Sequence, residues 1–140
     1  MSQAFTGIQK IRFDDVDGAG IVYSPESLHL CHATFEDFFG TAASLSYPAL
    51  VKERRLSFPT VAIQSEFQAP FSYGEAAFVT LTVKTIGRFP TVFIYDILRE
   101  RDGALCFQAE VTTVLVNLDM LSPLPIEAEL REIFEKLLRE

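Results

Sequence analysis

The sequence contains no tryptophan, only two cysteines and few basic residues. Its 140 residues include 12 Lys+Arg against 19 Asp+Glu, which gives a formal net charge of −7. Proteins that bind nucleic acid through phosphate neutralisation need a basic surface, so no nucleic-acid partner is expected. Two cysteines cannot build a disulfide framework, and Cys31 and Cys106 both lie in apolar segments. They are therefore expected to be free thiols in the core of a protein from a reducing compartment.

Long hydrophobic runs are also absent from the sequence. No uninterrupted apolar stretch approaches the ~20 residues that a membrane-spanning helix requires. The first residues, MSQAFTGIQK, lack the apolar core that follows the basic start of a signal peptide. We therefore expect a cytoplasmic protein without a membrane partner. Because 49% of the residues are hydrophobic and no linker or repeat appears, residues 1–140 are expected to form a single domain.

Apolar periodicity predicts a strand, a long helix and then four more strands. The helix begins at Ser24, which can serve as its cap, with Pro25 at the first helical position and Glu26 near the positive end of the helix dipole. It ends near Gly40. Short turns between successive strands indicate an antiparallel sheet, so the fold class is α+β, with a sheet wrapped around one helix. The pattern predicts strands at 5–13, 60–69, 79–84, 92–99 and 104–117, an irregular or short helical connection at 41–55, and a last helix at 126–139.

An acidic loop that contains glycine precedes the long helix. Asp14, Asp15 and Asp17 are followed by Gly18 and Gly20. Glycine allows tight turns and close approach of the backbone to a ligand, and the free N–H groups of a helix start can face a polarised carbonyl oxygen. A carboxylate beside such donors suits the hydrolysis of an acyl group, because one group attacks or activates water while the other stabilises the oxyanion.

Two other interpretations compete with this chemistry. Aspartate-rich loops before helices are most often solvated connections with no chemical role. A calcium-binding loop of the EF-hand type is excluded, because aligning Gly18 with its glycine puts Phe13 at the first ligand position and Ser24 at the last. The residues alone thus leave a solvated loop and a hydrolytic site as alternatives.

The loop and its flanks, Ile11–Tyr23 (IRFDDVDGAGIVY), resemble the signature of the hotdog-fold acyl-CoA thioesterases of the 4-hydroxybenzoyl-CoA thioesterase family. Segments 68–75, 86–92, 116–119 and 123–125 resemble later turns and strand ends of that family, in the expected order. The resemblance implies a hotdog fold, with an antiparallel sheet of five to six strands wrapped around one long central helix, plus a C-terminal helix. It also implies hydrolysis of a small acyl- or aryl-CoA thioester to free acid and CoA, without a cofactor, in a homodimer or homotetramer.

The resemblance assigns the catalytic groups to the acidic loop and the helix start. It places the catalytic carboxylate, as nucleophile or general base, at Asp17 and the oxyanion-binding backbone N–H at Ser24. Gly20 and Tyr23 are expected to contact the substrate. His32 stands where the family usually carries an acid, which makes it a third candidate catalytic residue or a changed hydrogen-bonding partner near the acyl pocket. The alternative is an ordinary core residue, as for most histidines on an apolar helix.

A locally basic stretch, 84–101, is expected to include the contacts with the CoA phosphates. Lys84, Arg88 and Thr91 lie at or near a turn that resembles one of the family's turns. The planar guanidinium of arginine suits phosphate recognition. The alternative is an ordinary solvated turn and strand face.

The two histidines, His29 and His32, bear on functions other than thioester hydrolysis. His29 and His32 lack a convincing third ligand, so no metal site is expected. A hotdog hydratase or dehydratase would pair a histidine with a carboxylate, but the nearest histidine after Asp17 is His29, twelve residues further on and inside the helix. A non-catalytic acyl-CoA-binding hotdog module stays open, since a fold alone does not fix function. The acyl group, and the choice between a CoA and an acyl-carrier-protein thioester, also stay open.

Overall fold

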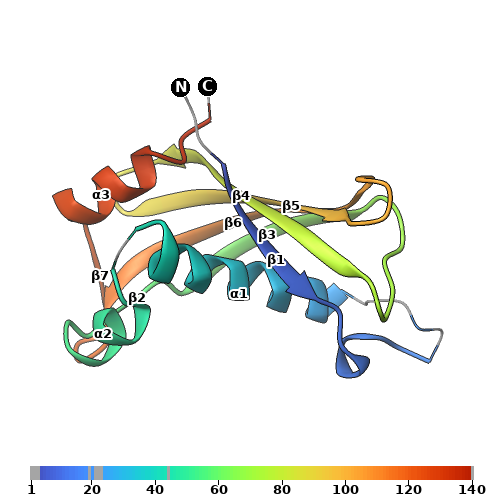
Figure 1. Cartoon of the computed structure of the whole chain (residues 1–140). Coiled ribbons are helices and arrows are strands. Elements are labelled where there is room, and N and C mark those ends of the chain that lie inside the picture. Colours follow the sequence, from blue (N-terminus) through green and yellow to red (C-terminus); the bar gives the residue numbers. More distant parts are fainter. Residues whose placement is uncertain (1–3, 19, 21–23, 44, 140) are drawn as a thin grey trace.

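A curved antiparallel sheet lies along one side of the long helix α1 (Ser24–Thr41), as the computed structural model shows (Figure 1). The structure describes residues 4–18, 20, 24–43 and 45–139. The strands are β1 (Phe5–Lys10), β2 (Leu56–Ser57), β3 (Thr60–Phe67), β4 (Ala76–Ile86), β5 (Pro90–Arg99), β6 (Leu105–Asn117) and β7 (Ser122–Leu124). The other helical segments are the 3-10 turn η1 (Phe13–Asp15), α2 (Tyr47–Lys52) and α3 (Ala128–Glu135).

The sheet has seven strands, in which β1, β4, β5, β6 and β2 follow one another while β3 and β7 also pair with β6. Every strand pair is antiparallel. The predicted α+β hotdog architecture is therefore confirmed, with a long helix against an antiparallel sheet. Two strands were not predicted, because β2 and β7 contain two and three residues, too few to show an alternating pattern.

The helices agree with the prediction except at the C-terminal end. α2 occupies part of the connection predicted as irregular or short helical, and its cap Ser46 accepts a hydrogen bond from the Ala49 N–H at 3.2 Å. α3 is shorter than the predicted helix at 126–139, because the chain leaves the helix to pair with β4. Val83 N–H donates to the Leu137 carbonyl at 2.8 Å, and Arg139 N–H donates to the Val83 carbonyl at 2.8 Å. None of the described helices is long and apolar enough to cross a membrane.

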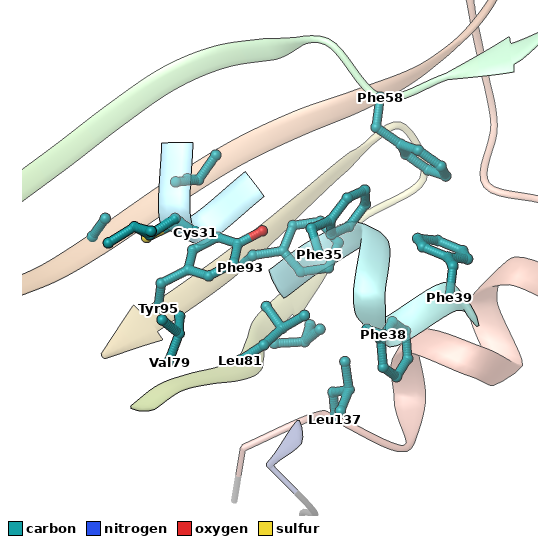
Figure 2. Close-up of a cluster of buried hydrophobic side chains, with 14 of the residues drawn as sticks. Cys31, Phe35, Phe38, Phe39, Phe58, Val79, Leu81, Phe93, Tyr95 and Leu137 are labelled. Carbon is teal, nitrogen blue, oxygen red and sulfur yellow. The ribbon is translucent and has the colours of Figure 1, made fainter. Parts of the chain in front are cut away.

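Phenylalanine side chains fill the core between α1, the sheet and α3 (Figure 2). Phe35 of α1 packs edge-to-face on Phe93 of β5, with ring centroids 5.2 Å apart. One turn later, Phe39 contacts Phe134 of α3 at 6.1 Å. Such pairs contribute about 0.5–1.5 kcal/mol each beyond the burial of their area. The predicted apolar face of α1 is thus confirmed as the face that packs against the sheet.

Both cysteines are free and buried, as predicted. Burial in the apolar core raises the pKa of the Cys31 thiol, with a smaller contribution from the negative charge of Asp96. The thiol is therefore protonated at neutral pH, and Cys31 is not a nucleophile.

Strand β3 differs from the prediction, because its alternating pattern does not correspond to a buried face. All of its residues are exposed, and Val61, Ile63 and Phe67 are 59%, 45% and 47% exposed. Register places Ile63 opposite the inward-facing Val111 of β6, so its side chain lies on the helix side of the sheet. Among the described elements β3 pairs with β6 alone, which leaves its other edge without a strand.

Candidate active site

The acidic loop between β1 and α1 owes its shape to hydrogen bonds of its own residues. The buried Asp15 carboxylate accepts a hydrogen bond from the Arg12 backbone N–H at 2.8 Å, which closes the η1 turn. Gly20 N–H donates to the Asp17 carbonyl at 2.9 Å. Asp17 itself is exposed. The two neighbouring aspartates therefore differ, since Asp15 fixes the loop while Asp17 is presented to solvent.

The turn that precedes β4 anchors this loop to the sheet. Ile11 N–H donates to the Glu75 carbonyl at 3.1 Å, and Tyr73 N–H donates to the Gly20 carbonyl at 3.2 Å. The exposed rings of Phe13 and Tyr73 meet edge-to-face with their centroids 5.8 Å apart. The position of the loop thus depends on the position of the turn.

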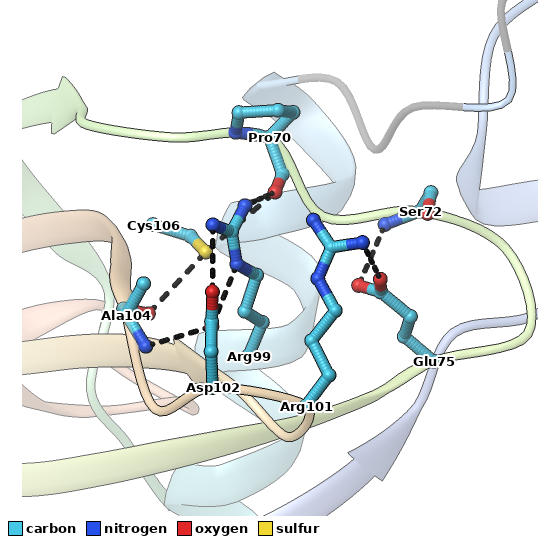
Figure 3. Close-up of polar contacts among 8 residues, drawn as sticks. All are labelled: Pro70, Ser72, Glu75, Arg99, Arg101, Asp102, Ala104 and Cys106. Atoms are coloured by element: carbon cyan, nitrogen blue, oxygen red, sulfur yellow. Dashed lines mark hydrogen bonds and ion pairs between the residues drawn. The ribbon is translucent and has the colours of Figure 1, made fainter.

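Charged residues of the β5–β6 hairpin contact and stabilise the turn that precedes β4 (Figure 3). Arg99 donates to both carboxylate oxygens of Asp102, at 2.8 and 2.9 Å, and to the Pro70 carbonyl at 2.8 Å. Arg101 lies 3.4 Å from the Glu75 carboxylate. Hydrogen bonding from Arg99, followed by that from a backbone N–H, lowers the pKa of Asp102 to about 2, so this pair is fully charged at neutral pH. Both arginines therefore support the turn beneath the acidic loop.

Gly20 has a backbone conformation that only glycine adopts without strain. Its φ is +79°, in the left-handed region, where another residue costs about 1–2 kcal/mol. We expect Gly20→Ala to lower the free energy of unfolding by about that amount, measured by chemical denaturation. The matched control is Gly18→Ala, because a Cβ at Gly18 meets no described atom within 4 Å and the φ of Gly18 lies outside the left-handed region. Equal stability of the two variants would contradict this assignment.

The acidic loop leads directly to the N-terminus of α1. The helix begins at Ser24, four residues after Gly20, and carries Glu26 in its first turn. Its first N–H groups have no acceptor within the helix and lie at the positive end of the helix dipole. Tyr23, which was predicted to contact the substrate, lies outside the described residues. The structure therefore connects Asp17, Gly20 and the start of α1 at one end of the sheet.

The residues predicted to contact CoA phosphates lie at the other end of the sheet. Asp17 follows β1, whose last residue Lys10 pairs with Ala76 at the start of β4, whereas Arg88 follows the end of β4. The 11 residues of β4 separate these ends by about 33 Å, at ~3.3 Å per residue. The basic stretch 84–101 is thus divided between two ends of the sheet and does not form one surface.

The three predicted phosphate-binding residues have different surroundings. Lys84 forms an ion pair with Glu110 at 2.6 Å. Thr91 is fully buried, so its side chain faces the core. Arg88 is exposed, and its guanidinium lies 5.4 Å from the centroid of the Phe89 ring. Lys84 thus has an acidic partner, whereas Arg88 has none within the described part of the chain.

The histidines of α1 both lie on the surface of the helix. His32 exposes 57% of its side chain, and its Nε2 lies 2.8 Å from the Glu36 carboxylate. His32 is therefore not a buried core residue, which was one of its interpretations, and its catalytic role stays a prediction. His29 is also exposed. Among the described residues, no group of three or more His, Cys, Asp or Glu side chains is arranged to hold a metal ion.

Sequence reasoning did not single out Tyr95 and Thr113, which line a small cavity beside His32. Both lie at inward-facing positions of strands whose other inward residues are mostly apolar. A residue with a hydroxyl group at an inward-facing position of an alternating strand is the sequence signal that could have identified them. Alternation predicts that such a hydroxyl is buried, but only the structure shows which residues surround it.

Comparisons with known proteins agree with this fold. A 1,4-dihydroxy-2-naphthoyl-CoA hydrolase from Synechocystis sp. is 25% identical over 122 residues, which cover 87% of this chain and 88% of the relative. A crystal structure of a 1,4-dihydroxy-2-naphthoyl-CoA thioesterase from Synechocystis superposes with a TM-score of 0.85 and 24% identity, over 96% of this chain and 98% of that one. A variant 4-hydroxybenzoyl-CoA thioesterase in complex with 4-hydroxybenzoyl-CoA also gives a TM-score of 0.85, with 23% identity over 95% and 99% of the two chains. Because the profile of the thioesterase-like superfamily matches residues 11–134, the chain belongs to that superfamily.

Proposed function

We propose that this chain hydrolyses acyl-CoA thioesters, with Asp17 as the reactive carboxylate and the backbone N–H of Ser24 as the donor that polarises the thioester carbonyl. The observation that carries the proposal is the exposed Asp17 in a loop closed by Gly20 that leads to the N-terminus of α1, a helix whose apolar face is buried. Asp17 either attacks the carbonyl carbon or takes a proton from the attacking water. In both routes the C–S bond breaks, CoA leaves with the sulfur, and water supplies the new oxygen of the free acid.

The proposed substrate carries a small acyl or aryl group. Proteins similar to this chain are named for 1,4-dihydroxy-2-naphthoyl-CoA and 4-hydroxybenzoyl-CoA, which supports an aryl- or small-acyl-CoA. The free buried thiols support a cytoplasmic location, where thiols stay reduced.

Release of free thiol from a panel of acyl-CoAs tests the proposed function. We expect turnover of at least one short acyl- or aryl-CoA by the purified chain. Binding of these compounds without turnover would replace the enzyme by an acyl-CoA-binding module. Turnover of acyl-carrier-protein thioesters alone would keep the chemistry and change the substrate class.

We also propose that two chains pair along the free edge of β3, in a homodimer or as part of a homotetramer. Val61, Ile63 and Phe67 expose large apolar side chains on this strand. The opposite edge strand, β1, exposes one large apolar residue, Ile8, and α1 covers its inner face. An exposed apolar edge is a template for pairing with another strand, so β3 is the edge that a second chain completes.

Arg88 is the proposed contact with the CoA phosphates. It lies far from Asp17 of its own chain, so the proposal assigns it to the substrate held by a neighbouring chain of the assembly. Its exposed guanidinium is available for phosphate, because no ion pair engages it within the described residues.

Arg88→Ala is expected to raise KM about three- to tenfold and to leave kcat within about twofold, because a phosphate contact far from the thioester strengthens binding without changing the chemical step. Steady-state kinetics with the best substrate of the panel measures both constants. Arg55→Ala, which breaks the surface ion pair with Asp119, is the control and should leave KM unchanged. A fall in kcat alone for Arg88→Ala would contradict the assignment.

A further inference from the structure

Residues 72–75 form a tight turn whose two ends are joined twice. The Glu75 N–H donates to the Ser72 carbonyl at 3.2 Å, and the Glu75 carboxylate accepts a hydrogen bond from the Ser72 N–H at 3.3 Å. Gly74 has a φ of +92°, in the region that the third residue of a type II turn requires. Figure 3 shows that the Glu75 carboxylate also contacts Arg101, whose guanidinium lies 3.4 Å away. The Glu75 side chain is only 17% exposed, so its carboxylate belongs to the turn and not to the solvent.

This turn contacts the acidic loop at both ends of the loop. At the start of the loop, the Ile11 N–H donates to the Glu75 carbonyl at 3.1 Å. At its end, the Tyr73 N–H donates to the Gly20 carbonyl at 3.2 Å, and the Gly20 N–H donates to the Asp17 carbonyl at 2.9 Å. The turn that Glu75 closes is therefore connected to Asp17 through two successive hydrogen bonds.

The contact between turn and loop matters for the reaction because a reactive carboxylate must be held close to its productive position. Asp17 is exposed, so packing in the core does not fix it. Glycine at position 20 gives the backbone beside it conformations that other residues do not adopt freely, so the loop depends on contacts from outside to keep one of them. A displacement of about 1 Å at a reacting group can lower the rate of an enzyme about 10²-fold.

We propose that Glu75 is a positioning residue for the reaction. By joining the two ends of the turn, it fixes the direction of the Tyr73 N–H, and this N–H holds Gly20 and, through it, Asp17. The inference rests on the proposed function, because it concerns the reaction of Asp17. It adds a residue that lies outside the acidic loop and outside the start of α1.

Of the two contacts of the Glu75 carboxylate, the hydrogen bond from the Ser72 N–H matters more for this role. It lies within the turn itself, and a charged acceptor strengthens it. Arg101 exposes 61% of its side chain, and exposed ion pairs contribute little. Because these two contacts engage the carboxylate, Glu75 acts through the backbone of the turn and not as a catalytic residue.

Steady-state kinetics of Glu75 variants with the best acyl-CoA of the panel tests the inference. Glu75→Ala removes the acceptor of the Ser72 N–H, so kcat should fall about tenfold while KM stays within about threefold. Glu75→Gln keeps an acceptor oxygen without the charge and should restore kcat to within about threefold of wild type. Glu100→Ala removes an exposed carboxylate of the β5–β6 hairpin and is the matched control, with both constants unchanged.

Two substitutions of Tyr73 test the hydrogen bond to the loop separately from the turn. Proline has no N–H and suits the second residue of a type II turn, so Tyr73→Pro removes the bond to Gly20 and keeps the turn. Tyr73→Ala keeps this N–H, and both variants lose the ring that contacts Phe13. Tyr73→Pro should therefore have a kcat about tenfold below that of Tyr73→Ala. Circular dichroism shows whether each variant is folded, and if Glu75→Ala does not fold, the Tyr73 pair decides the test.

Hydrogen exchange of the Gly20 amide reports the position of the loop without any substrate. This amide donates to the Asp17 carbonyl, so a loop that has lost its contact with the turn should exchange it faster. We expect faster exchange in Glu75→Ala and Tyr73→Pro than in wild type and Tyr73→Ala, measured by nuclear magnetic resonance. Unchanged exchange in both variants would show that the turn does not hold the loop.

The results distinguish failure of this inference from failure of the proposed function. Wild-type kcat in Glu75→Ala, or equal kcat in the two Tyr73 variants, would overturn the inference and leave the thioesterase proposal intact. A loss of kcat that Glu75→Gln does not restore would also overturn it, since the charge and not the bond from Ser72 would then act. If wild type hydrolyses no acyl-CoA, the proposed function fails, and exchange of the Gly20 amide alone decides whether Glu75 positions the loop.

Discussion

Asp17→Asn is expected to lower kcat by about 10²–10⁴-fold while KM changes by less than about threefold. The asparagine side chain has nearly the same size as aspartate, so the loop and the bound thioester keep their geometry. Its amide neither attacks the carbonyl carbon nor accepts a proton from water at neutral pH. Thiol release under saturating acyl-CoA measures the loss in kcat. Calorimetric titration of the variant with the same acyl-CoA shows whether binding is retained.

The loss must come from the chemistry of Asp17 and not from its charge alone. Asp37→Asn is the matched control, because Asp37 is another exposed carboxylate, on α1, and accepts a hydrogen bond from Gln9 at 2.9 Å. We expect it to retain wild-type kcat. Wild-type turnover by Asp17→Asn would exclude this carboxylate as the reactive group. Similar losses in both variants would indicate a general effect of charge.

Local rules predicted the elements that carry their own periodicity. The Ser24–Pro25–Glu26 start and the apolar spacing through Phe38 predicted the long helix, and the structure places α1 at Ser24–Thr41. Alternation of apolar and polar residues predicted strands β4, β5 and β6. Their apolar residues lie on the face that packs on α1, so burial of that one face explains the pattern. The short strands β2 and β7 form because they pair with β6, which is distant from β2 in the sequence. Such pairing produces no alternation of apolar and polar residues in two or three residues.

The surroundings of the site could be predicted less well, because they depend on how distant strands meet. Lys84 and Arg101 are close in the sequence, and their charges were counted as one basic stretch. Antiparallel pairing of β4 and β5 places them at opposite ends of the sheet, where Glu110 and Glu75 pair with them. Likewise, Thr113 has an unremarkable place in an alternating strand. Only the packing of α1 on β6 shows that its hydroxyl lies in a cavity.

Alternation correctly predicted that β3 is a strand, but the buried face that such alternation indicates is exposed in the structure. Ile63 and Phe67 lie on the helix side of the sheet, but α1 does not extend over them, and they are 45% and 47% exposed. An apolar face that the chain's own helix leaves uncovered indicates cover from outside the chain. The sequence pattern is then explained by the proposed assembly, with a second chain in place of the missing helix.

Charges on the free edge of β3 are therefore expected to separate the assembly into single chains. In the double variant Val61→Lys/Gln64→Lys, both positions are exposed, so the lysines leave the core of the single chain unchanged. In an antiparallel self-pair each edge would meet the added charges of the other, and like charges across paired strands oppose pairing. Light scattering after size exclusion should give the mass of one chain for the variant and a multiple of it for wild type.

Ile8→Lys on the other edge strand distinguishes loss of this interface from a general effect of surface charge. Ile8 is 67% exposed on β1, and its replacement should leave the mass of the assembly unchanged. The single chains of the β3 variant should also show a KM raised about three- to tenfold with kcat within about twofold, as for Arg88→Ala, because Arg88 of one chain would no longer reach the substrate held by another. Single chains with the KM of wild type would confine the site to one chain and remove Arg88 from it. An unchanged mass would show that β3 is not the edge at which the chains pair.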